Sequence, residues 1–476
     1  MLSSFILAPL ILLLILNLPF EFLRKQIAFW LTLSLLLNQI LLPVIHFWLP
    51  WSIYPDPLGR FFAFKLSLDM LSLIMLFSIA VVAFVSLLVA KSTLATERRK
   101  FNFINLLLIS LIGMNTTVLA TDIFSLYVFM EITAVAAFVL IAIEKNQFAV
   151  EGTFKYLILS IIASIFILTS IALLILASGD TSFKGIYAAF SSNFNTTLLN
   201  FAVGLFLCGL LIKCGVVPFH GWVPDAYSEA PIAVSVLLAG IVTKVSGIYV
   251  MLRLFSSVFV MGESFGNAIM FIGIISIVLA ALAAFRQNEI KRMLAYSSIS
   301  QVGYIALAVG CATPLAYLGA VLHFFNHAIF KSLLFVNSAS LEKKFGSTDT
   351  AIITGLGNQL PVTSVTSLVG LLSTAGIPPL SGFWSKLIII IALFNSGRFA
   401  YGSIALLASV LTLAYFLTLE RNVFFMKPEM TMDTEDGIPF SIKFSEILLA
   451  VITIGVGLGL PFILNALTSQ LKDIIH

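Results

Sequence analysis

The sequence predicts an all-α polytopic membrane protein with about 14 transmembrane helices, arranged as two inverted five-helix repeats with broken helices 7 and 12. Three observations predict this fold class. Of the 476 residues, 60% are hydrophobic and only 10% are charged, which is more apolar surface than a soluble domain can bury. Apolar runs of roughly 18 or more residues, enough to cross a bilayer, recur from one end of the chain to the other. Two of these runs are interrupted by proline and glycine beside a lysine.

The apolar runs are centred near residues 10, 38, 77, 110, 132, 165, 208, 242, 275, 300, 326, 376, 412 and 455. In the first run, Met1–Phe20, the charges follow the apolar stretch, whereas a cleaved signal peptide has its basic segment in front. We therefore expect a permanent first helix. The longest polar stretch, Lys427–Phe440, is too short for a domain. The expected division is 1–100 for helices 1–3, 101–260 for the first repeat (helices 4–8), 261–427 for the second repeat (helices 9–13), and 428–476 for a C-terminal loop and helix 14.

Lysine and arginine collect in the cytoplasmic loops of membrane proteins, so their distribution predicts the orientation. The odd-numbered loops hold 16 of the 26 basic residues and the even-numbered loops hold 6. This places the odd loops on the cytoplasmic side of the cell membrane and both termini outside. The odd-loop residues are Arg24, Lys25, Lys91, Arg98, Arg99, Lys100, Lys145, Lys155, Arg286, Lys291, Arg292, Lys343, Lys344, Arg421, Lys427 and Lys443, and the even-loop residues are Arg60, Lys65, Lys184, Arg253, Arg398 and Lys472.

The remaining four basic residues each fall within a predicted span: Lys213, Lys244, Lys331 and Lys386. An ionisable residue inside a membrane is costly, so a functional role is the default interpretation. The alternative is a lysine that extends to the membrane surface from near a helix end. That alternative fits Lys213 and Lys386, which lie beside helix breaks, better than the mid-run Lys244 and Lys331.

Among the acidic residues, only Asp69 and Glu131 are expected within the membrane. Glu131 lies centrally in the fifth span, whereas Asp69 opens the third span and is a candidate for the membrane surface. A buried carboxylate beside a buried lysine would let each group respond when the other gains or loses a proton. The alternative role for Glu131 is a static ion pair that holds two helices together.

Two spans are broken at corresponding places. In LIKCGVVPFHGWVPDAYSEAP (211–231), Lys213 stands shortly before Pro218, and in AGIPPLSGFWSKLIIIIALF (375–394) Lys386 follows two prolines. Proline removes a backbone hydrogen bond, and the freed carbonyls are tolerated in a membrane only if they pack in protein or line a wet cavity. Paired interrupted spans indicate an ion site built from inverted repeats. The alternative is that each break is a packing kink.

The segment HFFNHAIFKSLLF places His323, His327 and Lys331 four residues apart, so they lie on one helix face, each about a turn beyond the last. Histidine titrates near neutral pH and can pass a proton through either ring nitrogen. The row is therefore a candidate proton relay along the membrane plane, together with Glu131 and the other buried lysines. A metal site would need further ligands, and structural histidines are the other alternative.

Metal, disulfide and iron–sulfur chemistry are not expected in this chain. Its three cysteines, Cys208, Cys214 and Cys311, lie within apolar runs and form no C-x-x-C pair or His/Cys cluster.

Four segments carry a resemblance to a known family: KCGVVPFHGWVPDAYSEAP, QNEIKRMLAYSSISQVGY, HFFNHAIFKSLLF and AGIPPLSGFWSK. They are similar to signature stretches of the antiporter-like membrane subunits that occur in respiratory complex I (N/M/L-type subunits), in Mrp-type sodium/proton antiporters (D-type) and in membrane-bound energy-converting hydrogenases. The resemblance covers roughly Asn115–Lys386 strongly. The segment GIPPLSGFWSK and the overall length most resemble those of the Mrp D-type and hydrogenase-type subunits. Gln301 stands where many relatives carry histidine, so a polar relay there need not titrate.

This resemblance implies fourteen helices with two inverted repeats and a proton path. By motif match the path residues are Glu131, Lys213, Lys244 and Lys386, with His323, His327 and Lys331 in the connecting relay. The sequence carries no nucleotide loop, flavin motif, haem ligand or cluster motif, so no cofactor is expected in this chain, and iron–sulfur clusters or other redox centres are expected on partner subunits if the complex is redox-driven. Expected partners are sister antiporter-like and other membrane subunits, a peripheral redox arm in the redox-driven case, and the lipid bilayer, with no nucleic acid.

We therefore expect a proton-translocating subunit of a larger membrane complex, itself without a catalytic redox site. One alternative is a stand-alone secondary transporter that couples a small solute or Na⁺ to protons, which broken helices alone would permit. Another is an intramembrane enzyme that uses His220 and Asp225, which lie five residues apart without an obvious nucleophile.

Overall fold

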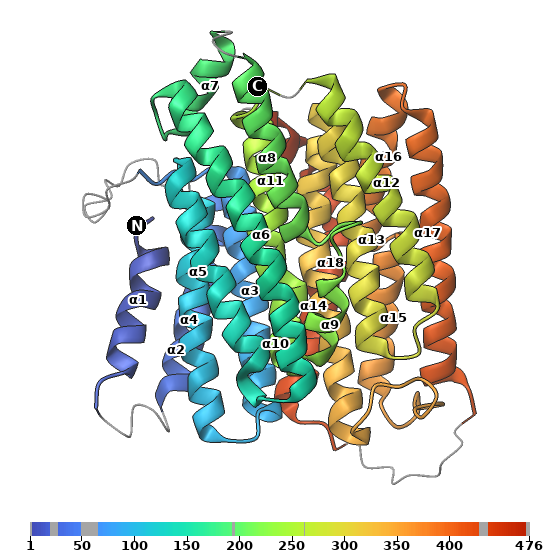
Figure 1. Cartoon of the computed structure of the whole chain (residues 1–476). Helices are drawn as coiled ribbons and strands as arrows, with labels where there is room; N and C mark the ends of the chain where they lie inside the picture. The colour runs from blue at the N-terminus through green and yellow to red at the C-terminus, as the bar shows by residue number, and fades with distance from the viewer. Residues whose placement is uncertain are drawn as a thin grey trace.

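A computed structural model describes residues 2–19, 27–48, 65–192, 196–260, 262–427 and 437–472. Its helices stand side by side as one bundle, with α1 and α2 at one edge and α17 at the other (Figure 1). Within the described ranges, β-structure is limited to isolated bridges. The helices are α1 (Ser4–Leu16), α2 (Ala28–Trp48), α3 (Met70–Thr93), α4 (Glu97–Leu119), α5 (Ile123–Ile141), α6 (Gln147–Ser178), α7 (Phe183–Ser191), α8 (Thr196–Cys214), α9 (Trp222–Glu229), α10 (Ile232–Leu237), α11 (Val250–Ser257), α12 (Glu263–Phe285), α13 (Ile290–Cys311), α14 (Pro314–Phe345), α15 (Pro361–Ala375), α16 (Ser381–Asn395), α17 (Phe399–Glu420) and α18 (Phe440–Lys472).

The predicted all-helical membrane fold is confirmed. In the described part of the chain, 12 helices are long and apolar enough to cross a membrane. The shorter α1 and the α15–α16 pair supply the two further spans that the sequence predicts. The seventh span is α8 followed by α9, and the twelfth is α15 followed by α16, so both predicted breaks are present.

The two halves repeat the same local design with opposite orientation. Helices α6 and α14 have 32 residues each, and each ends at a glycine in the left-handed conformation. After α6 the chain bridges back to the start of α5, through Asp122 and Ser182, and after α14 it bridges back to the start of α13, through Glu289 and Asp349. The first bridge lies at the upper end of the bundle beside α7, whereas the loop after α14 lies at the lower end (Figure 1). The boundaries at residues 100, 260 and 427 stay a prediction.

Close approach between α12 and α13 explains one glycine. A Cβ on Gly303 would lie 2.7 Å from the backbone oxygen of Gly273, closer than real side chains come. Small residues let transmembrane helices pack backbone against backbone. Because α13 lies directly against α14, this tight contact helps to fix the helix that carries the histidines.

The most enclosed spans lie at the centre of the bundle. The segment from α10 to α11 and the long helix α14 are almost entirely buried, whereas α6 and α17 expose one apolar side. Large apolar side chains on such outer faces suit contact with lipid or with a neighbouring subunit. The central spans are those that hold Lys244 and Lys331.

One assignment from the charge count is wrong. Arg253, which the count placed in an even-numbered loop, lies in α11 and is only 7% exposed. Hydropathy places a span's end only approximately, and this helix continues past the point where the apolar run weakens. Three other residues of the count, Arg24, Lys25 and Arg60, lie outside the described residues, as does the side chain of Lys472.

Candidate functional site

All seven candidate residues lie on membrane-spanning segments. Glu131 is on α5, Lys213 on the last turn of α8, and Lys386 on α16. Lys244 opens a π-helical segment, Lys244–Tyr249, between α10 and α11. The other three are on α14: His323, His327 and Lys331. The four lysines and both histidines are buried. The lysine side chains therefore end inside the bundle and not at its outer surface.

The structure brings Glu131 and Lys213 together. Lys213 Nζ lies 2.9 Å from Glu131 Oε1 and donates a hydrogen bond to Ser160 Oγ at 3.3 Å. Ser164 Oγ also donates to Glu131 Oε1, at 2.8 Å. The lysine side chain is 3% exposed but the carboxylate is 26% exposed. The pair therefore connects a buried cation to the more accessible face of α5.

The break in the twelfth span supplies the carbonyl groups that hold Lys386. Its Nζ donates to the carbonyl of Thr374 at 2.7 Å and to that of Ala375 at 3.4 Å. Both carbonyls belong to the last turn of α15, where a helix leaves carbonyl groups unpaired and carries partial negative charge. The Nζ also lies 4.7 Å from the centre of the Tyr304 ring, within the range of a cation–π contact. The break thus places hydrogen-bond acceptors beside the lysine, with no carboxylate among those contacts.

Lys244 is held in a similar way by an irregular backbone. Its Nζ donates to the carbonyl of Ala239, within the π-helical segment Leu238–Val242. It also lies 5.9 Å from the ring centre of Tyr227. A π-helical segment shifts the backbone pairing and is often found at functional sites. The sequence predicts a buried lysine here but carries no signal for the π-helix.

On α14 the two histidine rings follow each other along the helix. Their centres are 6.3 Å apart and their planes differ by 5°. One turn further on, Lys331 Nζ donates to the carbonyl of Leu294 at 3.2 Å and to Ser297 Oγ. The predicted row on one helix face is therefore present.

A hydrogen bond links this row to the twelfth span. His323 Nδ1 lies 3.0 Å from the hydroxyl of Ser385, the residue before Lys386. The ring centre of His323 is also 5.8 Å from that of Tyr304, over which Lys386 lies. His323 Nε2 and both ring nitrogens of His327 are buried and make no hydrogen bond within the described part of the chain. Buried polar atoms of this kind are usually satisfied by ordered water.

Sequence reasoning missed a second buried ion pair. Arg253 contacts both carboxylate oxygens of Asp69, which caps the start of α3, and its Nη2 donates to Ser72 Oγ at 2.9 Å. Its Nε donates to the Tyr249 hydroxyl at 3.0 Å. The pair joins the end of α11 to α3. A search for Arg as well as Lys near span ends would have found it.

The expectation that Asp69 and Glu131 are the only acidic residues within the membrane is wrong. Glu420, at the end of α17, and Glu446, on α18, are 1% and 0% exposed. Ser367 Oγ donates to Glu420 at 2.9 Å, and Ser340 Oγ donates to Glu446 at 2.7 Å. Both glutamates lie close to span ends in the sequence, where a loop position and a buried position look alike.

The histidine and aspartate of the enzyme alternative have other surroundings. Asp225 on α9 pairs with Lys155 at 2.6 Å and with Arg292 at 2.8 Å. It therefore ties α6 and α13 to the short helix after the first break. His220 lies in that break, before α9. Among the residues that the structure describes, no three His, Cys, Asp or Glu side chains come together as a metal site.

Residues 120–412 match the family described as "NADH:quinone oxidoreductase/Mrp antiporter, TM". The chain is 31% identical over 353 residues to the D-type subunit of the Na(+)/H(+) antiporter of Alkalihalophilus pseudofirmus, covering 74% of this chain and 71% of that protein. It is 32% identical over 356 residues to the N-type subunit of NADH-quinone oxidoreductase of Pelagibacter ubique, covering 72% and 74%. To the N-type subunit of F(420)H(2) dehydrogenase of Methanosarcina mazei it is 30% identical over 391 residues, covering 80% and 79%.

Solved structures share the whole fold. A chain of the membrane-bound sulfane sulfur reductase, an archaeal respiratory membrane complex, superposes with a TM-score of 0.88 at 28% identity, covering 100% of this chain and 98% of that one. A chain of the Mrp complex from Dietzia sp. gives a TM-score of 0.88 at 23% identity, covering 99% and 97%. The second likeness concerns the fold alone.

Proposed function

Because the chain belongs to the NADH:quinone oxidoreductase/Mrp antiporter family of transmembrane subunits, we propose that its buried lysines and histidines, together with the partly buried Glu131, form a path that moves protons. The observation that carries the proposal is the Glu131–Lys213 contact of 2.9 Å within the membrane. Such a pair is costly to bury, and its carboxylate remains partly exposed. The exposed face of α5 also carries Phe124 and Val135, so we infer that a neighbouring membrane subunit covers it and completes the path by which a proton reaches the pair.

The helices that carry these residues contact one another one after the next across the bundle. Helix α8, which ends in Lys213, packs against the π-helical segment that Lys244 opens, and α14 packs against the neighbouring segment Leu238–Val242. The histidines of α14 continue to Ser385 and Lys386. Coulomb interactions are strong in a low-dielectric interior, so a proton that arrives at one position biases the next. We infer that protons enter near Glu131 and leave near Lys386.

The orientation belongs to the same proposal. The excess of basic residues in odd-numbered loops favours a cytoplasmic location for those loops, with both termini outside. The partners that we propose are sister antiporter-like subunits and other membrane subunits. Redox centres, where the complex has them, lie on a peripheral arm of other chains.

A stand-alone transporter for a small solute is disfavoured. The relatives named above are subunits of larger assemblies. The buried lysines Lys331 and Lys386 also donate to carbonyls of neighbouring helices. Their contacts lie within the bundle, which leaves them poorly placed to bind a solute.

Transport by variants of the intact complex tests the proton path. The complex is purified through a tag on this chain, reconstituted into vesicles and assayed for proton movement with a pH-sensitive dye. Lys213→Ala and Glu131→Ala are each expected to abolish most transport while the complex still assembles. Lys184→Ala is the matched control, because Lys184 is an exposed lysine on α7. Normal transport in either pair variant defeats the proposed path.

The iron content of the same preparation distinguishes the classes of complex. Many iron atoms per complex indicate an arm of iron–sulfur proteins, and hence a hydrogenase-like or complex I-like assembly. Iron near zero indicates an antiporter assembly driven by ion gradients, in which this chain is the proton-conducting part.

A further inference from the structure

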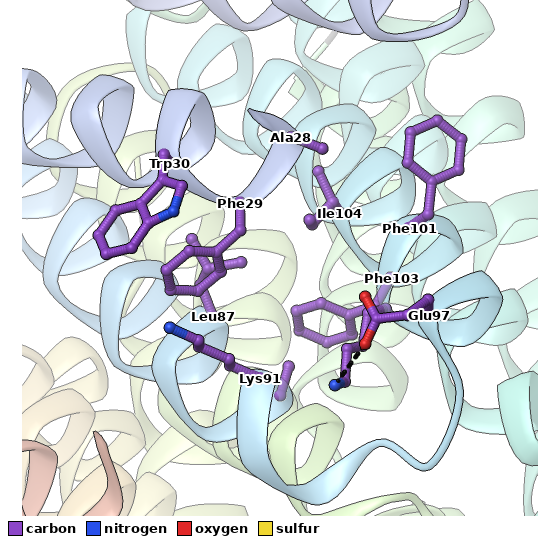
Figure 2. A pocket seen from close by; sticks show the side chains of 11 residues that line it. Ala28, Phe29, Trp30, Leu87, Lys91, Glu97, Phe101, Phe103 and Ile104 are labelled. Atoms are coloured by element: carbon purple, nitrogen blue, oxygen red, sulfur yellow. Dashed lines mark hydrogen bonds and ion pairs between the residues drawn. The ribbon is translucent and has the colours of Figure 1, made fainter. Parts of the chain in front are cut away.

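A pocket of about 210 Å³ lies at the odd-loop end of the bundle, between the start of α2, the end of α3 and the start of α4. Figure 2 shows its side chains, with Phe29 and Lys91 on one side and Glu97 and Phe103 on the other. A water molecule needs only about 10–15 Å³ of such space, so a phosphate group fits. None of these residues belongs to the proposed proton path.

The pocket has a cationic rim. Lys91 Nζ lies 4.5 Å from the ring centre of Phe29 and 5.0 Å from that of Trp30. Across the pocket, Lys100 pairs with Glu97 at 2.9 Å. Among the described residues, Lys91 forms no ion pair with a carboxylate. The described residues of the rim therefore supply two cations and one anion, and one of the cations lies against aromatic rings.

The walls of the pocket are apolar. Leu87, Phe103 and Ile104 are buried at its base, whereas Trp30 is 60% exposed at its edge. These residues belong to the ends of three membrane spans, so the pocket lies at the depth of the membrane surface. Tryptophan collects at this depth, and basic pockets between transmembrane helices bind lipid head groups.

We propose that this pocket binds the headgroup of an anionic phospholipid. The phosphate lies between Lys91 and Lys100, and the glycerol and first acyl carbons lie against the apolar wall of Leu87 and Ile104. The phosphate competes with Glu97 for Lys100. The Glu97 side chain is 66% exposed, and such surface ion pairs contribute little, so the exchange costs little. A soluble anion would use the same cations but would gain nothing from the apolar wall.

Charge-changing variants of opposite sign test the proposal. The intact complex, purified in mild detergent and stripped of lipid, is titrated with phosphatidylglycerol or with phosphatidylcholine, and bound lipid is counted by native mass spectrometry. Lys91→Gln is expected to weaken phosphatidylglycerol binding about fivefold, from roughly one unit of juxtamembrane charge. Lys91→Arg is expected to retain it. Glu97→Gln is expected to strengthen binding by a similar factor, an effect that loss of structure would not produce.

Arg286→Gln is the matched control, because Arg286 is an exposed basic residue at the odd-loop end of α12, away from the pocket. It is expected to leave binding unchanged. Equal binding of the two lipids, or equal effects of the Lys91 and Arg286 variants, overturns the proposal. Displacement of the lipid by millimolar inorganic phosphate also overturns it, because the site would then recognise a soluble anion.

Discussion

Removal of one partner from the Glu131–Lys213 pair is expected to destabilise the protein unequally, depending on which partner is lost. The relevant variants are Glu131→Gln, Lys213→Met and the double variant. Each keeps the size of the side chain close to that of the original residue, so the change is mainly one of charge. The two partners differ in burial, with 3% of the lysine side chain and 26% of the glutamate side chain exposed.

The magnitudes follow from that difference. Glu131→Gln leaves a buried ammonium group without its counter-charge, and a stranded buried charge costs about 3–5 kcal/mol. Lys213→Met leaves a carboxylate that still accepts from Ser164 and is less enclosed by the protein than the lysine was. Its cost is about 1.5–3 kcal/mol, that of a charge-assisted hydrogen bond. The double variant leaves neither charge without its partner. Its loss of stability is therefore expected to be smaller than the sum of the losses in the two single variants.

Apparent melting temperatures of the purified complex, measured at one fixed heating rate, give the order of these effects. Glu131→Gln is expected to melt lowest, with the double variant above it. Lys184→Met is the control, since Lys184 is an exposed lysine on α7. Proton transport is expected to stay lost in the double variant although stability returns. Additive costs would refute the reasoning, because additivity indicates that the two side chains do not interact.

Two further predictions concern packing. Arg253→Lys is expected to lower the melting temperature although it keeps the charge, because lysine cannot reproduce the two-pronged contact with Asp69; an unchanged melting temperature would contradict this. Gly303→Val is expected to prevent assembly, measured as the amount of intact complex recovered, because its Cβ would lie 2.7 Å from the Gly273 oxygen. Gly459→Val is the control, since a Cβ there meets no atom within 4 Å, and equal recovery of the two variants would disprove the packing argument.

The sequence was sufficient to predict where the spans lie, where two of them break and which lysines are buried. Each of these depends on local chemistry, since an apolar run, a proline or a lysine within such a run carries its meaning without knowledge of its neighbours. The histidine row is predictable for the same reason, because three residues four positions apart on a helix share a face whatever lies opposite. What lies opposite is not predictable in this way. Ser385, which contacts His323, is one of many serines in apolar runs.

The errors concern charged residues near span ends. Arg253, Glu420 and Glu446 lie where the apolar runs weaken, and hydropathy cannot tell a helix that continues inside the bundle from one that has reached the surface. Only the packing of a second helix decides the matter. For Arg253 that helix is α3, whose capping Asp69 supplies the counter-charge. The π-helical backbone around Lys244 is likewise a product of packing.

The way in which the lysines are held bears on what they can do. A protonated lysine has three donors. Within the described residues, Lys213 uses two of them, toward Glu131 and Ser160, and Lys386 uses two, toward consecutive carbonyls of α15. Lys331 also uses two. Two contacts fix the position of each ammonium group, and one donor of each has no partner among the described residues, as the proposed transfer of protons requires.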